Sequence, residues 1–174
     1  MFSPYLQAFS RLTIGLVFAL AFAGKARDVQ SFAQTIERFR ILPGALSCIA
    51  ACAFLTGELL VITAMLLGRT FLLWGFILAG LMLTAFCVAL ASVLFRRIQT
   101  PCNCFGASEK PASRYDILRN TGFIACALGG CFVTSTEPGG LTSLSVLEWW
   151  LTGMAALAFV MVSTQLGEIV AMFR

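Results

Sequence analysis

The sequence predicts an all-α integral membrane protein: a bundle of about five transmembrane helices with one short amphipathic helix at the interface. Of its 174 residues, 59 % are hydrophobic and only 11 % are charged, whereas a soluble domain averages roughly 25 % charged residues. The mean hydropathy is +0.91. The length suits a single transmembrane domain over residues 1–174, with no separate soluble domain.

Five runs are apolar enough to cross the hydrocarbon layer as helices, which takes about 20 residues each. They cover residues 5–23, 45–67, 70–95, 117–134 and 147–170. The runs lack the alternation of barrel strands, so helices are the remaining way to satisfy their backbone groups in lipid. Only Gly68 and Arg69 separate the second run from the third, which predicts a helical hairpin.

Residues 25–42, between the first two runs, are predicted to contain a short amphipathic helix that lies in the membrane interface. Apolar side chains recur there at steps of three and four residues, the spacing of one helical face, among charged ones. These apolar residues are Val29, Phe32, Ala33, Ile36 and Phe39. Pro43-Gly44 is predicted to end the helix.

Basic residues predict the orientation of the bundle. The segment after the first run has four, the segment after the third run has five, and the opposite side has Arg69, with Arg11 inside the first run. By the positive-inside rule, the N-terminus lies outside, whereas the C-terminus and the segment 96–116 are cytoplasmic. The expected surroundings are a lipid bilayer. No basic tract is interleaved with aromatic residues, so no nucleic-acid partner is expected.

The seven cysteines are the main reactive groups, because the chain contains no histidine. This excludes Ser-His-Asp and Cys-His catalysis, histidine-ligated haem and the common zinc sites. Cys102 and Cys104 lie one residue apart in a polar, turn-rich stretch, Pro101-Cys102-Asn103-Cys104-Phe105-Gly106. Two thiols this close can form a strained and labile disulfide, which favours a redox pair. Half of a metal site and a plain structural turn are the alternatives.

Cys48 and Cys52 are candidates for a second redox pair. They lie four residues apart at the start of the second run, so they share one helix face. In the predicted topology, this end lies on the same side as Cys102 and Cys104. The alternative is that Cys48 and Cys52 are small packing residues in an apolar helix. Cys87, Cys126 and Cys131 are interpreted as packing residues.

Glu58 and Arg11 are charged residues inside predicted spans. Counting 1.5 Å per residue from the external ends places Arg11 about 9 Å deep and Glu58 about 14 Å deep. An ion pair between them would explain how lipid tolerates both. Two interpretations remain open: Glu58 handles protons or faces a quinone cofactor, or the pair only fixes the first helix against the second.

The sequence resembles the MauE family of methylamine utilisation membrane proteins, in the wider DoxX-like group. The resemblance rests on Arg11, Gly15, Phe22, Gly24-Lys25, Asp28, Phe32, Leu42-Pro43, Gly57-Glu58, Cys102-Asn103-Cys104-Phe105-Gly106 and Arg119-Asn120. Family members usually show Cys-x-Cys-Phe-Gly, often with Gly in the middle. Asn103 stands there in this chain, and Asn also tolerates a left-handed backbone.

This resemblance implies a four-helix DoxX-like core plus one helix, in a bacterial inner membrane. It also implies a thioredoxin-like, MauD-like partner and a role in maturing methylamine dehydrogenase, whose small subunit is rich in disulfides. Together with the cysteines, it favours a membrane-embedded thiol–disulfide exchange or electron relay protein, with Cys102 and Cys104 as the exchanging pair. The alternatives are a thiolate-based transporter or chaperone for a soft metal such as Cu, Hg or Zn, and a non-catalytic docking partner.

Overall fold

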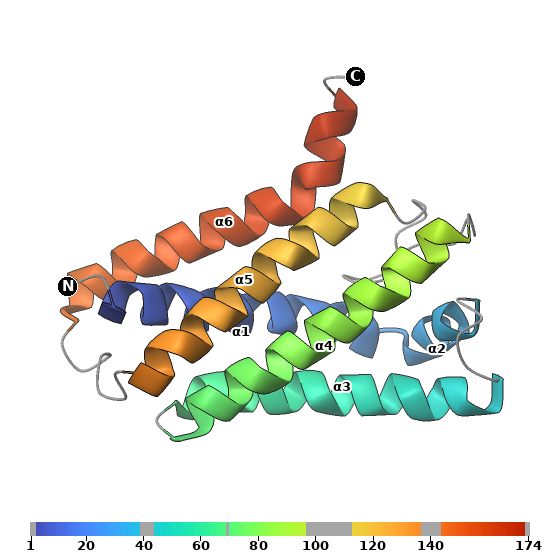
Figure 1. Ribbon diagram of the computed structural model, residues 1–174, viewed down its shortest axis with the longest axis horizontal. Coiled ribbons are helices and arrows are strands. Elements are labelled where there is room, and N and C mark those ends of the chain that lie inside the picture. Colours follow the sequence, from blue (N-terminus) through green and yellow to red (C-terminus); the bar gives the residue numbers. More distant parts are fainter. Residues whose placement is uncertain (1–2, 39–43, 69, 97–112, 137–143, 173–174) are drawn as a thin grey trace.

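Six helices make up the described part of the chain, and five of them are long and apolar enough to cross a membrane (Figure 1). The computed structural model describes residues 3–38, 44–68, 70–96, 113–136 and 144–172. The helices are α1 (Ser3–Ala26), α2 (Val29–Arg38), α3 (Gly44–Leu67), α4 (Thr70–Phe95), α5 (Arg114–Thr136) and α6 (Val146–Met172). No strand occurs among these residues. The predicted class, an all-α multi-pass membrane protein, is confirmed.

The five long helices alternate in direction along the bundle. Consequently α1 ends, α3 begins, α4 ends and α5 begins at the same end of the molecule, where α2 also lies (Figure 1). The predicted hairpin between α3 and α4 is present. Its turn uses Gly68 with φ of +65°, a left-handed conformation that glycine adopts without steric cost.

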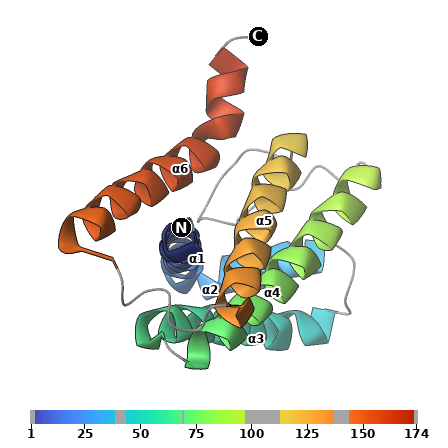
Figure 2. The same ribbon diagram turned by 60° about the vertical axis from the view of Figure 1, so that its left-hand side comes forward.

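Helix α1 is the central element, because it contacts α3, α5 and α6 along its length (Figure 2). The most extensive helix pair is α4 with α5. Gly130 of α5 allows this close approach, since a Cβ atom at that position would lie 2.4 Å from the ring of Phe76 on α4. The core between these helices is filled by large apolar side chains, including Ile14, Phe76 and Phe123.

Helix α2 has the predicted amphipathic character over Val29–Arg38, and Phe39 of the predicted face lies outside the described residues. Asp28 starts it by accepting a hydrogen bond from the backbone N–H of Ser31 at 2.9 Å. Its buried residue Phe32 packs edge-on against Phe54 of α3, with 6.5 Å between the ring centroids. Its position in the membrane interface stays a prediction.

Helix α6 packs mainly along α1 and touches α5 less (Figure 2). Ser145 and Glu148 form a reciprocal cap at its start, in which Glu148 Oε2 accepts from the backbone N–H of Ser145 at 2.6 Å. Tyr5 of α1 donates a hydrogen bond to the same carboxylate. The last turns of α6 bend away from the other helices (Figure 1).

Candidate functional site

Lys25 and Glu58 form an ion pair between the last turn of α1 and the middle of α3. Their side chains are only 5 % and 4 % exposed. The ammonium group also lies 5.2 Å from the centre of the Phe32 ring, a favourable cation–π distance. Lysine can place its charge this far from its backbone because its flexible stem packs along apolar surface. Glu58 is therefore held in the membrane interior by a cation from a neighbouring helix.

The ion pair predicted between Arg11 and Glu58 is wrong. Arg11 instead donates hydrogen bonds to the backbone carbonyls of Met65 at 2.6 Å and Leu66 at 3.1 Å. These carbonyls belong to the last turn of α3, where intrahelical partners are missing and the helix dipole is negative. The guanidinium group also lies against Gly68 in the turn. Arg11 thus caps α3 at the opposite end of the bundle from Lys25.

A cavity lies beside the ion pair, with both Lys25 and Glu58 in its lining. Side chains of α1, α3, α4 and α5 line it: Val17, Phe18, Ala21, Lys25, Phe54, Glu58, Met82, Leu83, Phe86 and Asn120. Most of this lining is apolar, and three residues supply the polar groups. Asn120 of α5 is 3 % exposed, and its Nδ2 has no hydrogen-bond partner among the described residues. The same holds for Glu58 Oε2.

The cavity does not fit the quinone considered for Glu58. Its volume is about 40 Å³. Pockets that bind organic ligands as large as a quinone occupy roughly 300 Å³ or more. The polar groups could hydrogen-bond to a quinone carbonyl, but the ring would displace the aromatic and Met side chains around it. A binding role for Glu58 or Arg11 toward a quinone gains no support from this geometry.

Cys48 and Cys52 are exposed on the outer surface of α3. They lie in the first turns of the helix, at the end of the bundle where α4 ends and α5 begins. Cys102 and Cys104 lie in the segment between α4 and α5, outside the described residues. Cys48 and Cys52 both lie in the apolar span Leu46–Leu67, so their exposed side chains face the surroundings of the bundle and not its interior.

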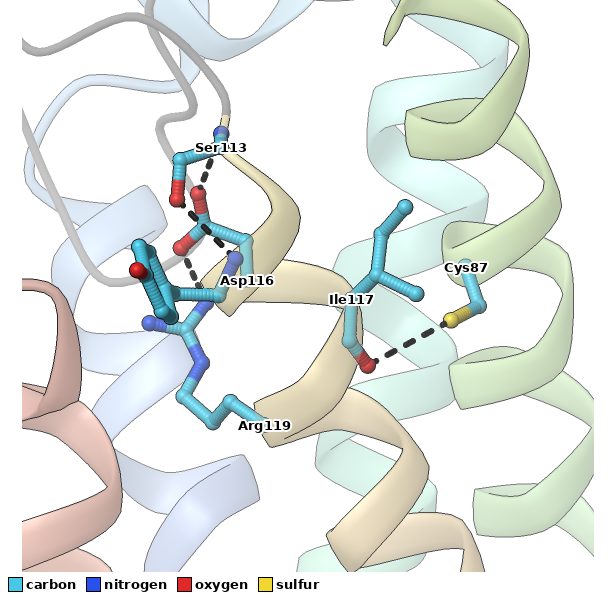
Figure 3. A network of polar contacts seen from close by, with 6 residues as sticks. Cys87, Ser113, Asp116, Ile117 and Arg119 are labelled. Carbon is cyan, nitrogen blue, oxygen red and sulfur yellow. Dashed lines mark hydrogen bonds and ion pairs between the residues drawn. The ribbon is translucent and has the colours of Figure 1, made fainter.

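The start of α5, which follows the segment with the cysteine pair, is fixed by polar contacts (Figure 3). Ser113 and Asp116 cap the helix reciprocally: the Ser113 backbone N–H donates to Asp116 Oδ2 at 2.9 Å, and Ser113 Oγ accepts from the backbone N–H of Tyr115 at 3.1 Å. Arg119 pairs with the same carboxylate at 3.3 Å. Nearby, the Cys87 thiol of α4 points at the carbonyl of Ile117 at 4.0 Å, a weak contact.

Three further cysteines occupy half-buried positions in the bundle, namely Cys87, Cys126 and Cys131. Cys126 and Cys131 pack against the apolar core, as expected of packing residues. Among the described residues, no three Cys, Asp or Glu side chains converge into a set of metal ligands.

Lys25 and Asn120 are the polar residues of this region to which sequence reasoning gave no role in a site. Lys25 was assigned to the segment after the first span, although a lysine one turn inside a helix end can extend toward the membrane interior. Asn120 had a clearer signal. It begins the buried face of α5, which continues through Phe123, Ala127 and Gly130 at helical spacing. A polar residue at the head of such a face points to a buried site.

Comparisons with known proteins agree with this architecture. The family model described as "Methylamine utilisation protein MauE" matches residues 3–133. A curated relative, "Methylamine utilization protein MauE" of Paracoccus denitrificans, is 28 % identical over 164 residues, which cover 92 % of this chain and 87 % of the relative. No solved structure matches the chain. Because the family model covers more than half of the sequence, the chain belongs to the MauE family of methylamine utilisation proteins.

Proposed function

We propose that this protein exchanges thiols and disulfides in the membrane, together with a thioredoxin-like partner of the MauD kind. By family, its pathway would be methylamine utilisation, and its end product a disulfide-rich periplasmic protein such as the methylamine dehydrogenase small subunit. The observation that carries the proposal is the Cys102-Asn103-Cys104-Phe105-Gly106 motif in a chain of the MauE family. The exposed Cys48 and Cys52 lie at the end where α4 leads into the segment with Cys102 and Cys104.

The proposed reaction moves two electrons between a cysteine pair of the partner and the pair formed by Cys102 and Cys104. A thiolate of Cys102 or Cys104 attacks one sulfur of the partner's disulfide, and the other partner sulfur leaves as a thiolate. The second cysteine of the pair then attacks the mixed disulfide. The partner ends with two thiols, and Cys102 and Cys104 end as a disulfide. The reverse sequence of steps oxidises the partner instead.

The charges of the described residues support an orientation in which the end of the bundle with Cys48 and Cys52 lies in the cytoplasm. That end carries the exposed Arg27, Arg38 and Arg96, whereas Arg11 at the other end is engaged with α3. The positive-inside rule assigns the basic side to the cytoplasm of a bacterial inner membrane. In this orientation Cys102 and Cys104 meet a reducing compartment and accept electrons from it.

Trapping of the mixed disulfide tests the proposal. In cells that express the full chain with its thioredoxin-like partner, Cys104→Ser or Cys102→Ser should leave one attacking thiol without a resolving one. One of these variants should therefore accumulate a covalent complex that reducing agent dissolves. Cys126→Ser is the matched control, because that thiol packs in the bundle, and it should trap nothing.

The double variant Cys102→Ser/Cys104→Ser separates exchange from docking. If exchange is the function, this variant abolishes maturation of the disulfide-rich enzyme while it still inserts in the membrane. Full maturation with the double variant would refute exchange and leave a non-catalytic docking role.

A further inference from the structure

Two buried residues that line the cavity between α1, α3, α4 and α5 each carry a polar atom without a hydrogen-bond partner among the described residues. These atoms are Glu58 Oε2, a hydrogen-bond acceptor, and Asn120 Nδ2, a donor. Both residues are only 3 % exposed. An unsatisfied polar atom costs several kcal/mol in hydrocarbon, so these two atoms favour the binding of a small ligand that both accepts and donates hydrogen bonds.

The size of the cavity selects the ligand. A water molecule needs about 10–15 Å³ of such space and two to four polar partners. The cavity has about 40 Å³, room for two or three water molecules. Its polar lining comes from Glu58, Asn120 and Lys25, of which Lys25 supplies a further donor. The remaining lining is apolar and would confine water to this polar end.

We propose that the cavity binds water, and that this water makes Glu58 a proton-exchange site inside the membrane. Water donates to Glu58 Oε2 and accepts from Asn120 Nδ2. A hydronium ion that arrives through this water gives its proton to Oε2, because Lys25 occupies Oε1. The products are a carboxylic acid and a neutral water molecule, and the reverse step releases the proton.

The groups around Glu58 leave Lys25 as its charged neighbour. From α1 the cavity receives Lys25, from α5 the neutral amide of Asn120, and from α4 only Met82, Leu83 and Phe86. Protonation of Glu58 therefore leaves Lys25 as an unbalanced cation. Because the ion pair joins α1 and α3, the protonation state of Glu58 affects the contact between these two helices. This proposal stands apart from the cysteine chemistry, since it involves none of the seven thiols.

Infrared spectroscopy of the full-length protein in lipid nanodiscs tests the site. Subtraction of the Glu58→Gln spectrum from the wild-type spectrum isolates the carboxyl band of Glu58. The expected result is a band that grows as the pH falls and that shifts within minutes of transfer to D₂O. Absence of a Glu58-dependent band at every pH where the protein stays folded would overturn the proposal, as would a band that does not shift over hours.

Two matched variants at position 120 test the water itself. Asn120→Leu keeps the volume but removes the donor, and exchange should slow by about tenfold or more, as expected for the loss of one hydrogen bond. Asn120→Ser keeps a polar group and leaves more room, so exchange should stay fast. Equal rates in both variants would overturn the water bridge. Should Asn120→Leu not fold, Ala21→Val narrows the same cavity from α1 and must slow exchange likewise.

Discussion

Lys25 at the end of α1 and Glu58 in the middle of α3 form a buried ion pair, with side chains 5 % and 4 % exposed. Neither residue has a second ion-pair partner among the described residues. The pair is therefore a coupled unit that joins two helices, and the removal of one member leaves the other as an uncompensated charge in a low-dielectric interior.

A double-mutant cycle should show this coupling. Lys25→Met and Glu58→Leu should each lower the free energy of unfolding by about 3–5 kcal/mol, because each leaves a buried charge unpaired. The free energy of unfolding should fall less in the double variant than in either single variant, since the double variant buries no charge at these two positions. Unfolding in mixed micelles by increasing detergent fraction measures all four proteins.

Arg27→Met is the control for this cycle. It removes a positive charge two residues beyond Lys25, but from an exposed side chain, and should change stability by less than about 0.5 kcal/mol. Additive losses in the double variant would show that Lys25 and Glu58 do not depend on each other.

Arg11 should stabilise the end of α3 through its geometry as well as its charge. Arg11→Met removes two hydrogen bonds from a charged donor to the carbonyls of Met65 and Leu66, and should cost about 1.5–3 kcal/mol. Arg11→Lys keeps the charge but cannot make the same forked contact, so it should recover only part of the loss. Thermal unfolding in detergent should give the highest melting temperature for the wild type, a lower one for Arg11→Lys and the lowest for Arg11→Met. A Lys variant as stable as wild type would reduce the role of Arg11 to charge alone.

Adjacent glycines of α5 should respond in opposite ways to alanine. At Gly130, a new Cβ would lie 2.4 Å from the Phe76 ring, so α4 and α5 must separate or the ring must move. Such overpacking costs about 1–3 kcal/mol. At Gly129, no atom lies within 4 Å of the new Cβ, and alanine should be neutral or stabilising by up to about 1 kcal/mol. Comparison of the two melting temperatures checks the closeness of the α4–α5 contact.

The sequence was sufficient for the helices because each span is a long, predominantly apolar run, in which single charged residues such as Arg11 and Glu58 are rare interruptions. The turn at Gly68 and the periodicity around Phe32 located the hairpin and α2 for the same reason: both signals are local. The partner of Glu58 is not a local property. Estimated depth suggested Arg11, but depth alone ignores which helix faces which, and the carbonyls at the end of α3 compete for the guanidinium group.

The candidate site likewise has features that the local sequence predicts and features that depend on how the helices pack. The spacing of Cys48 and Cys52 correctly places both on one helix face, but spacing cannot tell an inward face from an outward one in a helix that is apolar all round. The cavity beside Asn120 depends on four helices at once, so no single stretch of sequence contains it.

Cys48 and Cys52 should react as two independent exposed thiols and not as a disulfide within one helix. Residues four apart on a helix have Cβ atoms about 5–6 Å apart. A disulfide requires Cβ atoms about 3.5–4.5 Å apart. Mild oxidation of the purified protein in detergent should therefore leave no Cys48–Cys52 bond in a peptide mass spectrum. Both thiols should instead take up a small maleimide faster than Cys126, which packs against the core and is the control within the same molecule. A Cys48–Cys52 disulfide formed at high yield would mean that the first turns of α3 unwind readily, and would return this pair to the list of internal electron carriers.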